Sequence, residues 1–166
     1  MKHKITVPLS EDGIDRLIKK LDEYERWLEQ KCQELVNRLA QEGVTAAEWG
    51  FSSAVYDGVN DVTVRTEPRG ENVAAVIAVG NATLFIEFGS GVLLGYGHPE
   101  PNGYGPGTYP GKGHWDDPNG WWLPKEAQEA SGHKKSYGNY PSMAMYNAVK
   151  HLEQELTRIA QEVFSD

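Results

Sequence analysis

The sequence predicts an α+β fold, in which a small antiparallel sheet of three to four strands is packed by a long N-terminal helix and a C-terminal helix. Amphipathic patterns with helical spacing lie at both ends, and strand-like segments follow each other in the middle. The 166 residues fit one domain. Within residues 1–166 we expect N-terminal helices (1–54), a β-meander (59–88), a long Gly/Pro/aromatic loop or arm (89–141) and a C-terminal helix (142–166).

The first helix is predicted to begin after Ser10, a favourable N-cap, and to end near Gly43, a typical C-terminal stop. A helix of this length measures roughly 45 Å. Because this exceeds the width of the small sheet, one end should lack a partner within the chain. A shorter helix is expected at 45–54. The apolar residues of the long helix recur at intervals of mostly three and four: Ile14, Leu17, Ile18, Leu21, Tyr24, Leu28, Cys32, Leu35 and Leu39.

Three consecutive segments are expected to pair as an antiparallel meander. Residues 61–67 alternate between polar and apolar, and residues 72–79 are apolar on both faces. Residues 83–88 would place Leu84, Ile86 and Phe88 on one face and Phe85 and Glu87 on the other. The dipeptide Gly80-Asn81 is typical of a two-residue hairpin. Since the middle strand would be apolar on both faces, each face needs a cover. The helices can supply one cover, and a neighbouring subunit or the arm can supply the other.

The arm, residues 89–141, holds 12 of the 18 glycines and 7 of the 9 prolines, together with three tryptophans and five tyrosines. A loop of this length is usually functional or disordered. Large aromatics with polar tips are enriched at interfaces, so the composition favours a contact surface. The rings would also suit stacking on sugars, or packing back onto their own domain. A short strand is possible at 120–124, and Pro141 and Ser142 open the last helix.

Charge and residue spacing argue against several classes of partner. With a net charge of −8, the chain lacks the basic surface that is typical of a nucleic-acid-binding protein. No apolar run approaches the roughly 20 residues of a membrane span. His98, His114 and His133 are too widely spaced for a typical zinc site, although Asp116 and Asp117 follow shortly after His114 and could act as further ligands. We therefore expect neither a metal nor a cofactor.

Glu87 is the carboxylate for which the sequence leaves the most possible roles open. Glu87 lies between Phe85 and Phe88 in the sequence, and a carboxylate among aromatic residues can act as a general acid. A glycosidase, however, also needs a second carboxylate across a cleft. Asp116, Asp117 and Glu126 are available, but nothing in the sequence ties them to Glu87. The favoured interpretation is that Glu87 accepts backbone N–H bonds from the Gly89-Ser-Gly91 turn, or pairs with a basic residue of a neighbour.

Phe85-Ile-Glu-Phe-Gly-Ser-Gly-Val92 closely resembles a signature of the tail-completion proteins of long-tailed bacteriophages, also called head–tail connector or neck proteins. Those proteins typically read Phe/Tyr-Ile/Val-Glu-Phe-Gly-Thr-Gly at this point. Pro141-Ser-Met143 and Met145-Tyr-Asn-Ala148 resemble the start of the family's last helix, and the order of elements matches along nearly the whole chain. Ser90 replaces the usual Thr, and Ser142 and Ala144 replace bulkier residues. The arm is also longer than in many relatives.

The resemblance implies a non-enzymatic structural virion protein, assembled in the cytoplasm of the host bacterium. Such subunits form a ring, usually of six, which joins the head-completion or connector protein to the tail tube or tail terminator protein. Genomic DNA would pass through the ring without sequence-specific binding, and no membrane is involved. The alternative is a carbohydrate-binding or glycoside-hydrolysing protein that uses the aromatic loop and Glu87. The residues expected at interfaces are Glu87, Phe88, Gly89, Ser90, Gly91, Tyr96, Tyr104, Tyr109, Trp115, Trp121, Trp122, Pro141, Met143 and Tyr146.

Overall fold

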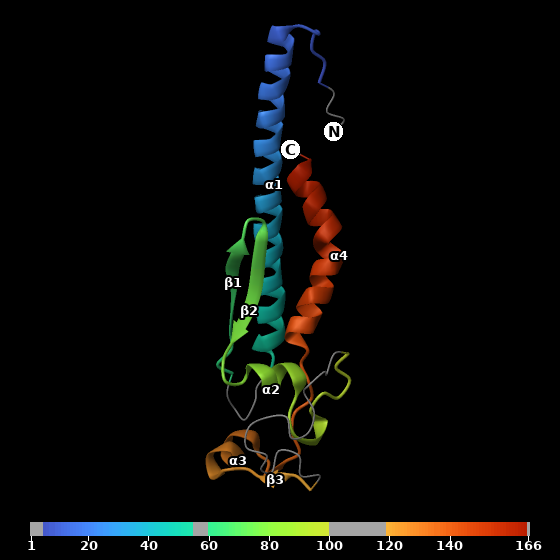
Figure 1. Cartoon of the computed structure of the whole chain (residues 1–166). Coiled ribbons are helices and arrows are strands. Elements are labelled where there is room, and N and C mark those ends of the chain that lie inside the picture. The colour runs from blue at the N-terminus through green and yellow to red at the C-terminus, as the bar shows by residue number, and fades with distance from the viewer. Residues whose placement is uncertain (1–4, 55–59, 100–118, 166) are drawn as a thin grey trace.

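The computed structural model describes residues 5–54, 60–99 and 119–165. Helices and a small antiparallel sheet make the fold α+β (Figure 1). The elements follow in the order α1 (Glu11–Ser52), β1 (Thr63–Gly70), β2 (Val73–Val79), α2 (Thr83–Phe88), the 3₁₀ turn η1 (Gly91–Leu93), β3 (Trp121–Trp122), α3 (Lys125–Ser131), β4 (Lys135–Ser136) and α4 (Ala144–Phe164).

Helix α1 is one continuous helix of 42 residues. It begins as predicted, with the Ser10 hydroxyl accepting the N–H of Gly13 at 3.2 Å. The predicted stop at Gly43 and the separate helix at 45–54 are wrong, because α1 continues to Ser52. A Cβ on Gly43 would lie 3.0 Å from Cγ2 of Val76 and 3.1 Å from Cδ1 of Leu152. Gly43 thus lets the β1–β2 hairpin and α4 pack closely against α1, and it does not end the helix.

The main sheet is a two-stranded hairpin. Strands β1 and β2 pair antiparallel, with Thr63 opposite Val79. The third strand predicted at 83–88 is wrong, since these residues form α2. Ala82 and Ile86, four residues apart, are both buried on one face of this turn of helix. Among the described residues the predicted meander of three to four strands is therefore a hairpin, with a separate two-residue pair between β3 and β4.

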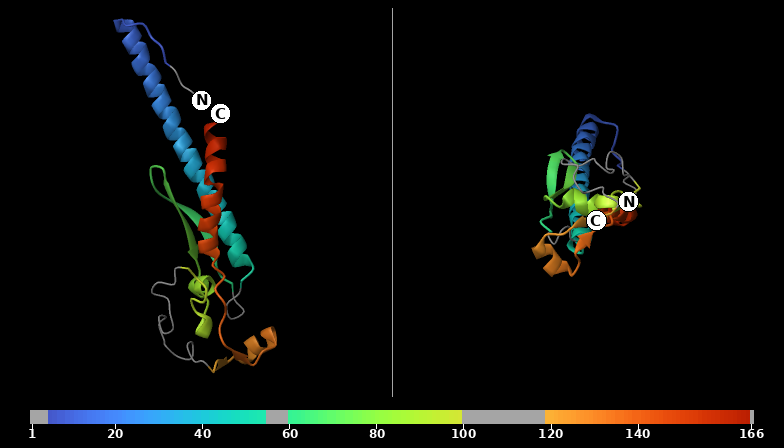
Figure 2. Two further views of the ribbon diagram at one scale, coloured as in Figure 1. Left: turned by 90° about the vertical axis from the view of Figure 1, so that its right-hand side faces the viewer. Right: turned by 90° about the horizontal axis from the view of Figure 1, so that it is seen from below.

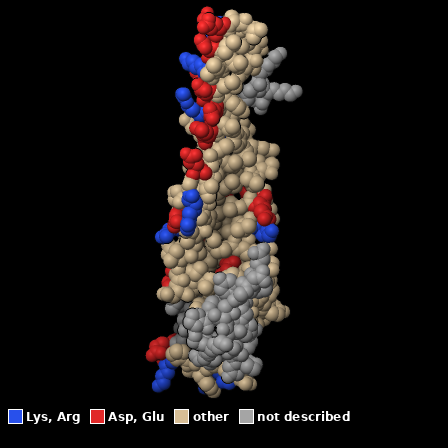
Figure 3. All heavy atoms as spheres, viewed as in Figure 1, with Lys and Arg blue, Asp and Glu red and all other residues tan. Residues whose placement is uncertain are grey.

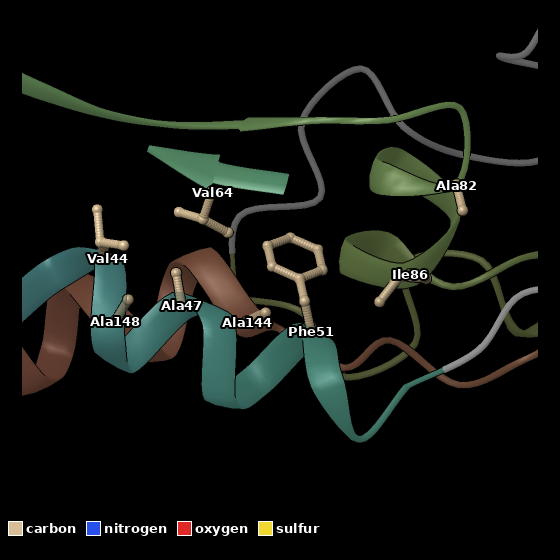
Figure 4. Packing of buried hydrophobic residues seen from close by; sticks show 8 residues of the cluster. All are labelled: Val44, Ala47, Phe51, Val64, Ala82, Ile86, Ala144 and Ala148. Carbon is tan, nitrogen blue, oxygen red and sulfur yellow. The ribbon is translucent and has the colours of Figure 1, made fainter. Parts of the chain in front are cut away.

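Helix α4 and the hairpin lie on different sides of α1 (Figures 1 and 2). The helices approach closely because their facing residues are small: a Cβ on Gly50 would lie 2.8 Å from the Cβ of Ala144. The core lies at the α2 end of α1, where α1, α4, β1 and α2 meet (Figure 4). Its buried members are Val44, Ala47, Phe51, Val64, Ala82, Ile86, Ala144 and Ala148.

Polar pairs join α1 to α4 above this core. Arg38 pairs with Glu162, and Nε2 of His151 lies 2.7 Å from Oε1 of Glu42. Hydrogen bonds from Arg38 and then Arg158 hold the pKa of the Glu162 carboxyl below its usual value. Both α1 and α4 are amphipathic, so the seam between them has an apolar centre and polar edges.

The chain is elongated, because α1 extends well beyond the C-terminal end of α4, whereas α2, α3 and β3 gather at the other end (Figure 1). Ile14, Ile18 and Leu21 in the extension are exposed. Among the described helices and strands none covers this end of α1 fully, which agrees with the expectation drawn from the length of the helix.

Candidate functional site

Glu87 caps the start of α4. Its Oε2 accepts the N–H of Met145 at 2.8 Å, and its Oε1 accepts the N–H of Tyr146 at 3.0 Å. These are the second and third residues of α4, where the side chain of an N-cap residue normally bonds. The residue at the cap position is Met143, which has a left-handed backbone (φ 55°) and makes no side-chain cap bond. A carboxylate from α2 therefore takes the place of a local cap.

The environment of Glu87 suits a buried anion. The residue is only 5% exposed, and a buried carboxylate is stable when its oxygens are hydrogen-bonded. The N-terminus of α4 supplies two N–H donors and the positive end of the helix dipole. Nε2 of His98, which is also buried, lies 3.5 Å from Oε1 of Glu87. The His98 ring lies 4.5 Å from the ring of Phe88 and 5.7 Å from that of Tyr146, between centroids.

Backbone bonds extend this contact on both sides of Glu87. The N–H of Ser142 donates to the carbonyl of Ile86 at 2.8 Å, and the N–H of Ser90 donates to the carbonyl of Asn139 at 2.9 Å. The Ser90 hydroxyl accepts the N–H of Asn139 at 3.0 Å. We call residues 86–98 and 137–146, held together in this way, the loop junction. The two ends of the long loop thus leave and rejoin the body at one place.

Two glycines permit this close approach. Gly138 has φ 110°, and a Cβ there would lie 1.9 Å from the carbonyl oxygen of Ser90. Gly89 has φ 80°, and a Cβ there would lie 2.5 Å from the carbonyl oxygen of Asn139. Both the backbone conformation and the lack of space exclude any other residue without rearrangement. Glycine is therefore required in both chain segments of the loop junction.

Asp61 makes a second carboxylate cap beside the loop junction. Its Oδ2 and Oδ1 accept the N–H groups of Asn81 at 2.8 Å and of Ala82 at 3.0 Å, at the start of α2. The bonds from Ala82 and Asn81 hold the pKa of the Asp61 carboxyl below its usual value. Asp61 thus helps to fix α2, which carries Glu87. This bond pattern also explains why Gly80-Asn81, predicted as a hairpin, leads into a helix.

Aromatic side chains lie on the outside of the loop junction and of the adjoining β3. Tyr96 and Tyr140 are each 66% exposed, and their rings meet edge to face with centroids 5.6 Å apart. Trp122 is 68% exposed, with the Lys135 ammonium 5.1 Å from its ring centroid. Exposed rings with polar tips provide contact area of the kind enriched in interfaces.

Several of the predicted site residues come together in the loop junction, and others do not. The part of the signature from Glu87 to Gly91 meets Pro141, Met143 and Tyr146. Tyr96 lies on the outer surface of the junction, and Trp121 and Trp122 form β3. Tyr104, Tyr109 and Trp115 lie outside the described residues. The expectation that backbone N–H groups bond Glu87 is confirmed, but the donors belong to α4 and not to the glycine turn. Contacts with other subunits stay predictions.

Sequence reasoning missed four members of this region. Asp61 and Asn139 act through partners 21 and 49 residues away, and no local pattern marks such pairs. For His98 the sequence leaves open a metal ligand or a solvent-facing or hydrogen-bonding residue of a polar loop, whereas the residue is a buried neighbour of Glu87. Tyr140 precedes Pro141 directly, yet nothing in the sequence pairs it with Tyr96.

The geometry bears on the enzymatic alternative. Both oxygens of Glu87 accept N–H groups of α4 and the residue is 5% exposed, so in the described part of the chain Glu87 serves as a cap of α4. In residues 5–54, 60–99 and 119–165 no group of three His, Cys, Asp or Glu side chains is arranged to hold a metal. His114, Asp116 and Asp117 lie outside these ranges. No helix in the described part of the chain is long and apolar enough to cross a membrane.

Comparisons of the chain with protein-family models, with curated proteins and with solved structures find no match.

Proposed function

We propose that the chain is a structural virion protein, a ring-forming tail-completion or neck subunit that joins the head connector of a phage to its tail tube. One observation carries the proposal. The two motifs that resemble the tail-completion family, at Phe85–Gly91 and at Pro141–Met143, lie more than forty residues apart in the sequence and bond to each other in the loop junction. Their most polar members, Glu87 and Ser90, hold the architecture together.

A structural role agrees with how the polar groups are used. Glu87 caps α4 with both oxygens, and Ser90 bonds Asn139 through both its N–H and its hydroxyl. Catalytic groups usually face a cleft that admits substrate. The side chains of Glu87 and Ser90 are buried within the chain. We therefore assign these residues to positioning the loop, and the exposed rings to contacts with partners.

The surface offers two kinds of patch, as a ring requires. In a heterologous interface one surface of a subunit meets a different surface of the next. The aromatic patch of Tyr96, Tyr140 and Trp122 lies at one end of the molecule, and Ile14, Ile18 and Leu21, each about half exposed, lie in the part of α1 at the other end (Figure 1). In this proposal six copies assemble in the host cytoplasm, and the ring binds the connector on one side and the tail tube or terminator on the other. The net charge of −8 reduces adhesion of passing DNA.

The proposal is tested on phage particles induced from the strain that encodes the chain. We expect mass spectrometry of purified virions to detect the chain, and immunogold labelling to place it between head and tail. Deletion of its gene should give separate heads and tails. Intact, infectious particles after deletion, or virions that lack the chain, would contradict the proposal.

Matched variants separate the contact surface from the scaffold. Tyr96→Ala combined with Tyr140→Ala should leave the fold intact and reduce the yield of joined particles, because both rings are mostly solvent-exposed. Trp49→Ala is the control, since Trp49 is a 79% exposed aromatic residue of α1 that does not belong to the patch of Tyr96, Tyr140 and Trp122. Equal particle yields for the two variants would show that the aromatic patch is not a contact surface.

A further inference from the structure

The first part of α1 extends past the end of α4. The rings of Trp27 and Phe164 meet edge to face with centroids 6.1 Å apart, which marks the point where α4 ends beside α1. Helices of 42 and 21 residues measure about 63 and 32 Å. Residues 11–28, which we call the α1 extension, therefore form about five turns of helix at and beyond the end of α4.

The α1 extension carries an apolar stripe that no other described element covers fully. Five of its large apolar residues are between 39% and 52% exposed, whereas Leu17 on the same side is half-buried. In Figure 3 the charged atoms of this part of the molecule follow one edge, and a broad surface beside them carries no charge. An apolar stripe of this spacing on a solvated helix indicates a packing partner. The exposed members are Ile14, Ile18, Leu21, Tyr24 and Leu28.

Charges of opposite sign flank the two sides of this stripe. At 3.6 residues per turn, the side next to Ile18 carries Glu25 and behind it four further carboxylates. The side next to Tyr24 carries Lys20; Lys31, one turn beyond the extension on the same side, pairs with Glu34 of its own chain at 3.3 Å. Lys19 and Arg26 lie further round, on the polar back of the helix. The four further carboxylates of the acidic side are Glu11, Asp15, Asp22 and Glu29, and all are exposed.

This charge arrangement selects one kind of occupant and one orientation. When two copies of such a helix pack in parallel, the acidic side of each faces the basic side of the other, with Lys20 directed toward Glu25 of the second copy. When they pack antiparallel, acidic faces acidic and basic faces basic, which is repulsive. We propose that the α1 extension binds the α1 extension of a second copy of this chain, in parallel.

The inference goes beyond the proposed function and does not rest on it. A stripe that meets the same stripe of a second copy makes an isologous contact about a twofold axis, so it joins copies in pairs and differs from the heterologous contacts that close a ring. Five turns are short for a coiled coil that associates alone. The contact is therefore expected to be weak in dilute solution.

The first experiment measures self-association of the full chain by sedimentation velocity over a range of concentrations. Leu21→Gln should weaken self-association by roughly tenfold or more, because it removes the centre of the stripe. Glu23→Gln is the control, since it introduces the same residue on the polar back. Circular dichroism establishes that both variants keep their helices. A chain that stays monomeric at all concentrations, or equal effects of the two variants, would overturn the proposal.

The second experiment tests the orientation. In a Cys32→Ser background, Ile14→Cys should form a disulfide between copies under mild oxidation, because position 14 meets itself only in a parallel pair. Leu21→Cys lies at the centre of the stripe and meets itself in either orientation. Cross-linking at 21 without cross-linking at 14 identifies an antiparallel pair and overturns the proposal. Lys20→Glu with Glu25→Lys should restore association that either change alone weakens.

The outcomes separate this inference from the proposed function. If virions lack the chain but two copies cross-link through position 14, the neck role is refuted and the α1 contact is supported. Normal assembly of joined particles by the Leu21→Gln variant, together with no cross-linking at 14, would refute the α1 contact and leave the neck role standing.

Discussion

The cap that Glu87 provides to α4 makes a specific prediction about stability. The substitution Glu87→Gln keeps the size of the side chain but removes its charge and replaces one acceptor oxygen by an NH₂ group. One of the N–H groups of Met145 and Tyr146, now bonded at 2.8 and 3.0 Å, would then face a donor. The change therefore alters the chemistry of the contact with little change in packing.

The magnitude follows from two losses. A buried N–H left without an acceptor costs about 1–3 kcal/mol. Loss of the negative charge from the N-terminus of a helix costs about 1–2 kcal/mol at a site that is largely shielded from water. Glu87 is 5% exposed, so water compensates little of either loss. The two losses add up to about 2–5 kcal/mol, and we expect Glu87→Gln to lower the free energy of unfolding by that amount.

The assay is urea unfolding followed by circular dichroism, with Glu71→Gln as the control. Glu71 lies exposed in the turn of the hairpin, so its substitution should change the free energy of unfolding by less than about 0.5 kcal/mol. Amide exchange should also accelerate at Met145 and Tyr146 in the Glu87→Gln variant. A Glu87→Gln protein as stable as the Glu71→Gln protein would refute the assignment of Glu87 as the cap.

Three further predictions concern neighbouring parts of the molecule. Gly138→Ala should lower the free energy of unfolding by at least about 2 kcal/mol more than Gly132→Ala, which also has positive φ but open space around it; equal melting temperatures of the two variants would count against the close approach. The folded-state pKa of Asp61 is lowered, so its contribution to stability is present above about pH 4 and is lost as the pH falls through the folded-state pKa. Asp61→Asn should therefore show a smaller fall in urea midpoint between pH 7 and pH 3 than wild type, and an unchanged fall would contradict this. Trp122→Ala should alter thermal stability little, because the ring is mostly exposed, but should reduce the yield of joined particles; a large loss of stability would assign Trp122 to the fold.

The sequence predicted the helices and the hairpin better than it predicted their ends. Ser10 marks the start of α1 because its hydroxyl makes a local cap bond, which a pattern can reveal. The prediction that the helix ends at Gly43 is wrong because glycine occurs both at helix ends and at sites where two elements pack closely. Only the positions of Val76 and Leu152 show which role applies.

The segment 83–88 shows the limit of periodicity. Six residues rich in Phe, Ile and Leu favour a strand by propensity, and so few residues do not distinguish a period of 2 from one of 3.6. Asp61, some twenty residues earlier, supplies the bonds that start a helix there. Tertiary contacts thus outweigh local preference, and they are not visible in the segment itself.

For the candidate site, the sequence named Glu87, Met143 and Tyr146 as interface residues, which stays a prediction. Within the chain these residues contact one another, which the sequence did not specify. The exact donors to Glu87 depend on the left-handed backbone of Met143, which aims the first N–H groups of α4 at α2. A positive φ at a methionine is uncommon and has no sequence signal.

The closed geometry of the loop junction has a consequence for how such chains diversify. The bonds between Ser90 and Asn139 join positions 49 residues apart, and they do not involve the residues between them. The entropy needed to close a flexible loop grows only with the logarithm of its length, so doubling the loop costs about 0.6 kcal/mol. Insertions between the two halves of the junction are therefore inexpensive for the scaffold. The loop is therefore a natural grafting site, at which inserted residues can change the surface of the molecule while the described scaffold stays the same.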